Sequence, residues 1–160
     1  MESLSNIRIQ KLIILSFVIL FIILQTFFPM KGIGFFLVLP SIFMLLTYKP
    51  DSISYGSCFI LGLINDMFSM QLLGVSSIVF LSFRFIKILN GNISSKDYLG
   101  VLKEYLVYAY ILLISVYLFM LSLGVYEFDL VSLLTILLIQ LFGFFVCYYA
   151  WIKIFEMLEK

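Results

Sequence analysis

Long apolar stretches separated by short polar turns make up most of the chain between residues 12 and 152. Most of them approach the length of about 20 residues that a helix needs to cross a hydrocarbon core about 30 Å thick. The pattern therefore predicts six transmembrane helices. Their expected ranges are 12–28, 34–48, 53–68, 72–89, 105–124 and 130–152. We expect an all-α polytopic membrane protein, folded as a single membrane domain over residues 1–160.

The composition agrees with this fold class. Hydrophobic residues make up 64% of the chain, charged residues 12%, and the mean hydropathy is +1.19. Soluble domains carry about 25% charged residues, and their cores cannot absorb so much apolar surface. Pro29, Met30 and Lys31 follow the first apolar stretch where a cleavable signal peptide would have small residues. The first helix is therefore expected to stay as a membrane anchor.

Basic residues orient the expected bundle, because Lys and Arg beside membrane spans are retained on the cytoplasmic side. With the amino terminus inside, nine of the ten basic residues fall on that side, and Lys31 alone falls outside. The nine are Arg8, Lys11, Lys49, Arg84, Lys87, Lys96, Lys103, Lys153 and Lys160. This asymmetry predicts an even number of spans with both termini in the cytoplasm.

The connection 90–104 holds the main polar block of the chain and is expected to be a cytoplasmic loop. Its last residues, 97–104, suit a short interfacial helix. Two interpretations stay open for this loop: a docking surface for a partner or anionic lipid, and a solvated linker that fixes the topology.

Small residues recur every four positions in the third expected helix, at Ser54, Cys58 and Gly62, and Asp66 continues the series. Residues with this spacing share one helix face, and small side chains let a second helix approach closely. Cys58, with Ser54 and Pro40, is therefore expected to serve helix packing. Pro40 lies within the second expected helix, where its missing N–H group favours a kink. Neither Cys58 nor the second cysteine, Cys147, has the spacing of a metal site or a disulfide framework, so both are expected to be buried packing residues.

Asn65 and Asp66 interrupt the apolar run of the third helix near its outer end. An ionisable residue at membrane depth marks a functional site by default. Three interpretations of Asp66 stay open. Its carboxylate accepts N–H groups at the start of the next helix, between Gly74 and Ser77; it couples proton movement to transport or conformational change; or it contacts a partner subunit directly.

Aromatic and basic side chains near the expected helix ends suit the membrane interface. Tyrosines there are expected to form an interfacial belt with Trp151. They are Tyr98, Tyr105, Tyr108, Tyr110, Tyr117, Tyr126, Tyr148 and Tyr149. Arg84 and Lys87 are expected to extend to the lipid headgroups without a buried partner.

Catalytic and ligand-binding motifs are missing from the sequence. It has no histidine, no nucleotide-binding glycine loop, and no HExxH or Gly-x-Ser-x-Gly arrangement. A net charge of +1 with scattered basic residues offers no patch for nucleic acid. We therefore expect a protein that is not an enzyme, has no cofactor and no metal site, and does not bind nucleic acid.

The string Gly62-Leu-Ile-Asn-Asp66-Met-Phe-Ser69, followed by Leu73-Gly74-Val75-Ser76-Ser77, resembles the signature of the bacterial rod shape-determining protein MreD family. In that family Gly-x-x-x-Asp closes one span, and Leu-Gly with small residues opens the next. Pro40, the Lys49-Pro50 turn and the length of 160 residues are also similar. The sequence departs from the family at Met70-Gln71-Leu72, where members commonly carry a glycine, a small polar residue and often a proline.

The resemblance implies a non-enzymatic subunit of the elongasome, the machinery that elongates peptidoglycan in rod-shaped bacteria. It implies the cytoplasmic (inner) membrane as location and MreC as partner, with MreB, RodA and a class B penicillin-binding protein in the same complex. The implied fold is a six-helix bundle similar to the substrate-binding subunits of energy-coupling-factor transporters. The residues expected to shape the outer hairpin or to bind a partner there are Gly62, Asn65, Asp66, Ser69, Gly74 and Ser77.

A second function from a different class stays open, namely the substrate-binding membrane component of a vitamin or metal uptake transporter. Such a component needs several polar groups that converge on a cavity in the outer half of the bundle. The polar residues expected in that half are Gln25, Asn65, Asp66, Ser69, Gln71 and Gln140.

Overall fold

The computed structural model describes residues 2–27, 37–69, 72–89, 98–124 and 130–158. These residues form six α-helices and one 3-10 turn, and none of them lies in a strand. The elements are α1 (Glu2–Thr26), α2 (Val38–Tyr48), η1 (Pro50–Ser52), α3 (Tyr55–Ser69), α4 (Val75–Leu89), α5 (Tyr98–Ser122) and α6 (Leu130–Leu158). The all-helical class expected from the apolar pattern is therefore confirmed.

Three of the described helices are long and apolar enough to cross a membrane. Their spanning segments are Ile9–Thr26 in α1, the whole of α5, and Leu134–Leu158 in α6. Helix α2 has 11 residues, and α3 and α4 have 15 each. Fifteen residues extend about 22 Å, which is less than a hydrocarbon core of about 30 Å. The apolar pattern predicted these helices at 34–48, 53–68 and 72–89, so α2 and α4 are shorter than expected. By length, the described residues provide three spans, not the six of the expected bundle similar to the substrate-binding subunits of energy-coupling-factor transporters.

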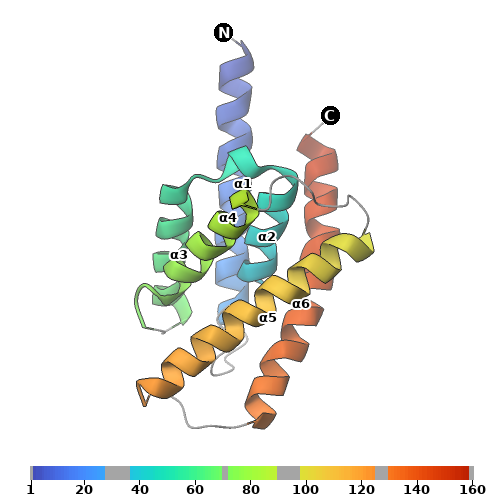
Figure 1. Ribbon diagram of the computed structural model, residues 1–160. Helices are drawn as coiled ribbons and strands as arrows, with labels where there is room; N and C mark the ends of the chain where they lie inside the picture. The colour runs from blue at the N-terminus through green and yellow to red at the C-terminus, as the bar shows by residue number, and fades with distance from the viewer. Residues whose placement is uncertain (1, 28–36, 70–71, 90–97, 125–129, 159–160) are drawn as a thin grey trace.

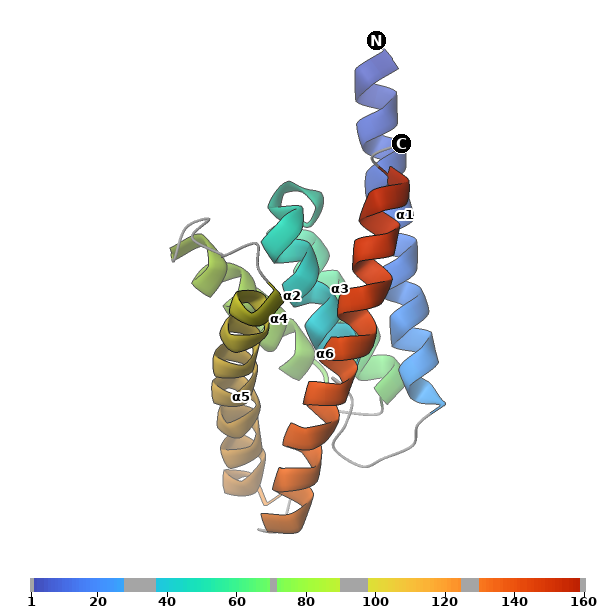
Figure 2. The same ribbon diagram turned by 90° about the vertical axis from the view of Figure 1, so that its right-hand side faces the viewer.

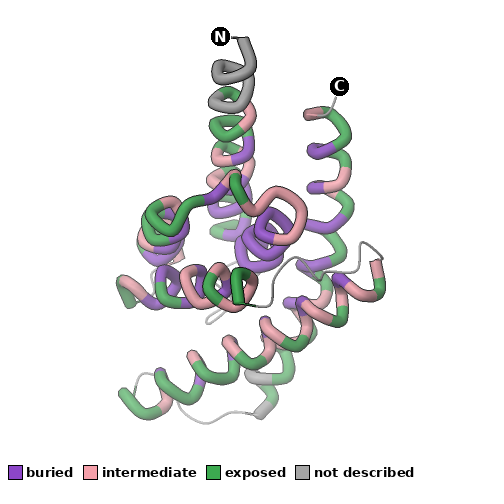
Figure 3. The backbone as a smooth tube through the Cα atoms, turned by 45° about the horizontal axis from the view of Figure 1, so that its top comes forward, coloured by how far each residue is buried: buried purple, intermediate pink, exposed green. Residues whose placement is uncertain are grey.

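Helix α2 is the centre of the molecule. It contacts α1, α4, α5 and α6, and every residue from Val38 to Leu46 is buried. Figure 3 shows this buried helix enclosed by helices whose outer faces are exposed. A helix that is apolar on all sides suits this position, because it meets protein on every side.

Pro40 does not kink α2. The helix begins at Val38, so Pro40 lies in its first turn, where backbone N–H groups have no partner within the helix in any case. The carbonyl of Leu37 then accepts hydrogen bonds from the Ser41 hydroxyl at 2.7 Å and from the Cys147 thiol at 3.2 Å. Both cysteines, Cys58 and Cys147, are free and buried, as the sequence predicted.

Four aromatic residues assigned to an interfacial belt are buried in the core instead, namely Tyr105, Tyr117, Tyr148 and Trp151. Trp151 and Tyr105 are both fully buried. Trp151 packs on Phe21 of α1 with ring centroids 6.1 Å apart, and Tyr105 stacks on Phe144 of α6 at 4.7 Å. Tyr105 also meets Phe43 of α2 edge-on at 5.2 Å. These rings lie where α1, α5 and α6 pack around α2, and sequence position alone did not separate such sites from helix ends.

Helix α5 crosses the front of the bundle obliquely and touches it along one narrow stripe (Figure 1). The buried residues of this stripe are Val101, Tyr105, Ala109, Leu113, Tyr117 and Met120. Large apolar side chains such as Ile111 and Leu118 are exposed on its other faces, which suits contact with lipid. Because α5 begins at Tyr98, residues 98–104 are helical, whereas residues 90–97 of the expected cytoplasmic loop lie outside the described part of the chain.

Candidate functional site

Helices α3 and α4 form an antiparallel hairpin that closes most tightly at Gly62. A Cβ atom on Gly62 would lie 2.3 Å from the Cα atom of Ser77 and 2.4 Å from its nitrogen. Such distances are far inside van der Waals contact, so only glycine allows this approach. On the other side of the contact, the Ser77 hydroxyl donates a hydrogen bond of 2.9 Å to the carbonyl of Phe59. The hairpin is therefore held by backbone packing at a glycine, as the small-residue series predicted.

The buried part of the small-residue series is shorter than expected. Cys58, Gly62 and Asp66 are all buried in α3. Ser54 is exposed and lies before the helix, where its hydroxyl accepts the N–H of Ser57 at 3.1 Å. Ser54 is therefore an N-cap, and its assignment to helix packing was wrong.

Asp66 caps the start of α4 from the facing helix. Its Oδ2 atom accepts the N–H of Gly74 at 2.7 Å, and its Oδ1 atom accepts the N–H of Ser76 at 3.0 Å. The first N–H groups of a helix have no partner within it, and the helix dipole favours a negative charge at this end. The hydrogen bonds predicted for Asp66 are therefore present, and its side chain is fully buried.

Gly74 is required at this turn for its backbone conformation. Its φ is +98°, in the left-handed region that side chains with a Cβ rarely adopt, and no atom lies within 4 Å of the place where a Cβ would be. Glycine is thus required at position 74 for its positive φ angle, and at position 62 because a side chain would collide with Ser77.

A chain of amide and hydroxyl groups joins this hairpin to α1. Asn65 donates to the Ser76 hydroxyl at 2.8 Å, and its Oδ1 atom accepts a hydrogen bond from Gln25 of α1. The same Gln25 amide lies 3.5 Å from the Ser69 hydroxyl. We call Gln25, Asn65, Asp66, Ser69 and Ser76 the hairpin cluster. Gln25 was predicted as an outer polar residue, but its place in this cluster depends on how α1 packs, which the sequence does not encode locally.

The hairpin cluster joins polar groups of the protein to one another. Both oxygens of Asp66 accept backbone N–H groups, and Asn65 both donates and accepts within the cluster. In a low-dielectric surrounding such bonds fix a geometry strongly, because an unpaired polar group there is costly. The arrangement is therefore suited to holding α1, α3 and α4 in one fixed relation.

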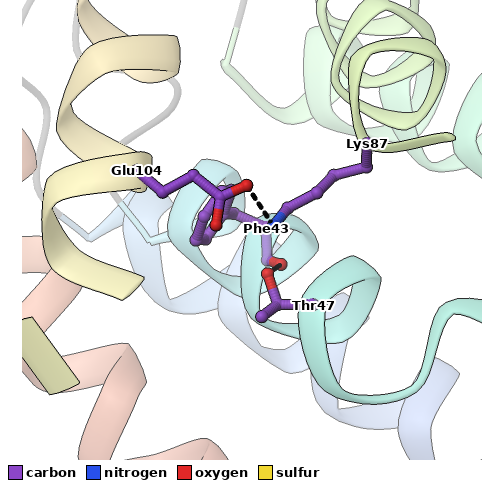
Figure 4. Close-up of polar contacts among 4 residues, drawn as sticks. All are labelled: Phe43, Thr47, Lys87 and Glu104. Atoms are coloured by element: carbon purple, nitrogen blue, oxygen red, sulfur yellow. Dashed lines mark hydrogen bonds and ion pairs between the residues drawn. The ribbon is translucent and has the colours of Figure 1, made fainter. Parts of the chain in front are cut away.

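A second polar group at the other end of α4 was missed by the sequence analysis. Lys87 forms an ion pair of 2.6 Å with Glu104 of α5, and the two side chains are only 8% and 22% exposed. Figure 4 shows the two side chains pointing toward one another beside Phe43, and the Lys87 nitrogen lies 4.6 Å from the centroid of that ring. Lys87 therefore has a protein partner, contrary to the expectation that it only extends to the headgroups.

Arg84 also has protein partners. Its guanidinium donates to the carbonyl of Pro50 at 3.2 Å and to the carbonyl of Ile53, and it lies 4.7 Å from the centroid of the Tyr55 ring. These contacts fasten the η1 connection, between α2 and α3, onto α4. The apolar pattern predicted that Arg84 lies near the end of a helix. It did not predict that the carbonyl groups of Pro50 and Ile53 accept hydrogen bonds from its side chain.

A buried hydrogen bond joins α5 and α6. The hydroxyl of Tyr105 donates to Oε1 of Gln140 at 2.8 Å, and both residues are fully buried. Gln140 was predicted as a polar residue of the outer half, and a polar side chain in an apolar helix is the signal that could have located this pair. Its bond to Tyr105 separates it from the hairpin cluster, which belongs to α1, α3 and α4.

The chain matches no family model, no curated protein and no solved structure. Function is therefore inferred from the resemblance of the sequence and from the site itself. Of the residues singled out beforehand, the structure brings together Gly62, Asn65, Asp66, Ser69, Gly74 and Ser77 in one hairpin. Pro40 and Ser54 lie elsewhere, at the starts of α2 and α3.

Proposed function

We propose that this chain is a non-enzymatic membrane subunit of the bacterial elongasome, which supports rod shape and peptidoglycan synthesis by binding MreC and cell-wall synthases. One observation carries the proposal. The residues that resemble the MreD signature each have a structural task in the same hairpin: contact at Gly62, capping at Asp66 and a left-handed turn at Gly74. Chance produces a set of matching residues that all act in one hairpin less easily than it produces matches spread over the fold.

The proposal includes a six-helix bundle in the cytoplasmic membrane, with α2, α3 and α4 inserted beside the three long helices. Two features support this arrangement. The amino and carboxyl ends lie at the same end of the molecule in both views (Figures 1 and 2), as an even number of spans requires. The carboxyl ends of α2, α4 and α6 point toward it too (Figure 1). Lys49 directly follows α2, and Lys87 and Lys153 lie in the last parts of α4 and α6, as expected of a cytoplasmic face.

The flank of the hairpin is the surface that we propose for a membrane helix of MreC. Phe59 and Ile60 on α3, and Ile78 and Phe85 on α4, are 47 to 66% exposed. The contacts at Gly62 and Asp66 hold these two helices rigidly, so the flank is a fixed shape against which a partner helix can pack.

The test is co-purification of the tagged chain from its native membrane in mild detergent, with partners identified by mass spectrometry. The proposal expects MreC and penicillin-binding proteins. A Phe59→Ala/Ile78→Ala variant should recover less MreC at an equal amount of folded chain. The matched control is Ile111→Ala/Leu118→Ala, which removes exposed apolar side chains from α5 and should recover as much MreC as the unchanged protein. Recovery of paired ATPases with a coupling membrane subunit would instead identify a component of vitamin or metal uptake.

A further inference from the structure

Charged side chains divide the molecule into two ends. Among the residues whose side chains are described, every charged group except Asp66 lies in or beside η1, the first part of α1 or α5, or the last part of α2, α4 or α6. Figure 1 shows these parts of the helices on the side of the two termini. The charged residues are Lys11, Lys49, Asp51, Arg84, Lys87, Lys103, Glu104, Lys153 and Glu156. Exposed charged side chains of membrane proteins lie at the headgroups or beyond, because a charge that faces lipid hydrocarbon is costly. Asp51, Lys103 and Lys153 are exposed at this end, so it marks one surface of the bilayer.

Helix lengths measured from that surface differ between the two halves of the molecule. From Leu89, the last residue of α4, to Gly74 the chain reaches only about 22 Å. From Lys153 to Val131 along α6 it reaches about 33 Å, enough for a hydrocarbon core of about 30 Å. Tilt only shortens the reach of a helix. Figures 1 and 2 agree with these lengths, since the far end of the α3–α4 hairpin stops short of those of α5 and α6.

The short end of the molecule has the surface chemistry of a membrane interior. Among the described residues at the end of the α3–α4 hairpin, the large exposed side chains are apolar: Met67, Phe68, Leu72 and Leu73. Asp66 at this end is fully buried and bonded to backbone N–H groups, and the exposed Thr26 donates its hydroxyl to the carbonyl of Ile23. Lipid hydrocarbon demands that polar groups be satisfied within the protein in this way.

We propose that the joined ends of α3 and α4 stop within the hydrocarbon layer and are covered by acyl chains of the far leaflet. The bilayer is then thinned locally over the hairpin cluster, beside the taller α5–α6 pair. Acyl chains fit this surface better than a protein partner does, because the large exposed side chains described there offer no group for a specific hydrogen bond. The inference requires only that the chain spans a bilayer, and it holds whether or not the elongasome proposal is correct.

The test measures the depth of a fluorescent label in phosphatidylcholine vesicles that contain the full chain. Leu73→Cys, at the hairpin end, and Val131→Cys, at the start of α6, are each labelled with a bimane maleimide. Both residues are at least 70% exposed, whereas Cys58 and Cys147 are buried, so the unchanged protein reports background labelling. Nitroxide lipids labelled at mid-chain or at the headgroup, and aqueous iodide, then serve as quenchers.

At Leu73→Cys we expect the mid-chain nitroxide to quench about twofold more strongly than the headgroup nitroxide, with little quenching by iodide. At Val131→Cys the order of the two nitroxides should reverse. Stronger headgroup or iodide quenching at Leu73→Cys would place the hairpin end at the surface and overturn the proposal. Protection of that label from all three quenchers would overturn it as well, because a protein would then cover the site.

Discussion

At the scale of single residues, Gly62 is the position with the least tolerance. Gly62→Ala forces a Cβ atom to within 2.3 Å of the Ser77 backbone, so α3 and α4 must separate. We expect a loss of about 3 kcal/mol in stability, at the upper end of the usual cost of overpacking. Thermal unfolding in detergent measures it. Gly56→Ala is the matched control, since its Cβ would meet only the Ser54 hydroxyl at 3.8 Å; an equal loss in both variants would show that the Ser77 contact is not the cause.

Asp66 tests whether geometry or charge matters at the cap. Asp66→Asn keeps one oxygen acceptor, so we expect a loss of about 1 kcal/mol in stability, whereas Asp66→Ala leaves two buried N–H groups unpaired and should lose about 3 kcal/mol. Thermal unfolding in detergent gives both values. If a stably inserted Asp66→Asn variant fails to restore rod shape in cells that depend on this chain, the carboxylate charge has a role beyond capping.

At the scale of helices, the Lys87–Glu104 ion pair is the main polar link between α4 and α5 in the described residues. Lys87→Met leaves a poorly solvated carboxylate and should cost about 3 kcal/mol, whereas Lys87→Met/Glu104→Met removes both charges and should recover most of that loss. Thermal unfolding provides the comparison, and Lys153→Met, at an exposed position, is the control. A double variant as unstable as the single one would mean that the pair stabilises by attraction rather than by mutual neutralisation.

The sequence predicted the helices better than their contacts. Apolar periodicity located all six helices, and the four-residue spacing of Cys58, Gly62 and Asp66 identified the packed face of α3. Apolar periodicity does not predict contacts between distant segments. The partners of Lys87 and Gln25 depend on how the helices pack against one another. The same limit explains Pro40, whose effect depends on where α2 begins. The residues around Pro40 fit a place in the first turn of a helix as well as one in its middle. In the first turn a proline is tolerated, whereas in the middle it kinks the helix.

At the scale of the whole molecule, the number of spans decides the topology. With the amino terminus inside, six spans place residue 124 outside and the carboxyl terminus inside. Spans formed by α1, α5 and α6 alone would reverse both. We therefore expect alkaline phosphatase fused after Gly124 to be active and the same enzyme fused after Leu158 to be inactive. Green fluorescent protein at the same two positions should give the complementary pattern, and the opposite result would restrict the spans to the three long helices.

The bonds from Asp66 to the start of α4 also impose a condition on synthesis at the membrane. A lone aspartate within an inserting helix costs up to about 3 kcal/mol. The N–H groups that compensate Asp66 belong to Gly74 and Ser76, which are made later. While α3 is the last helix to have left the ribosome, its carboxylate has no partner from α4. We therefore expect α3 to wait at the translocon until α4 follows, so that the two helices enter the lipid as a pair.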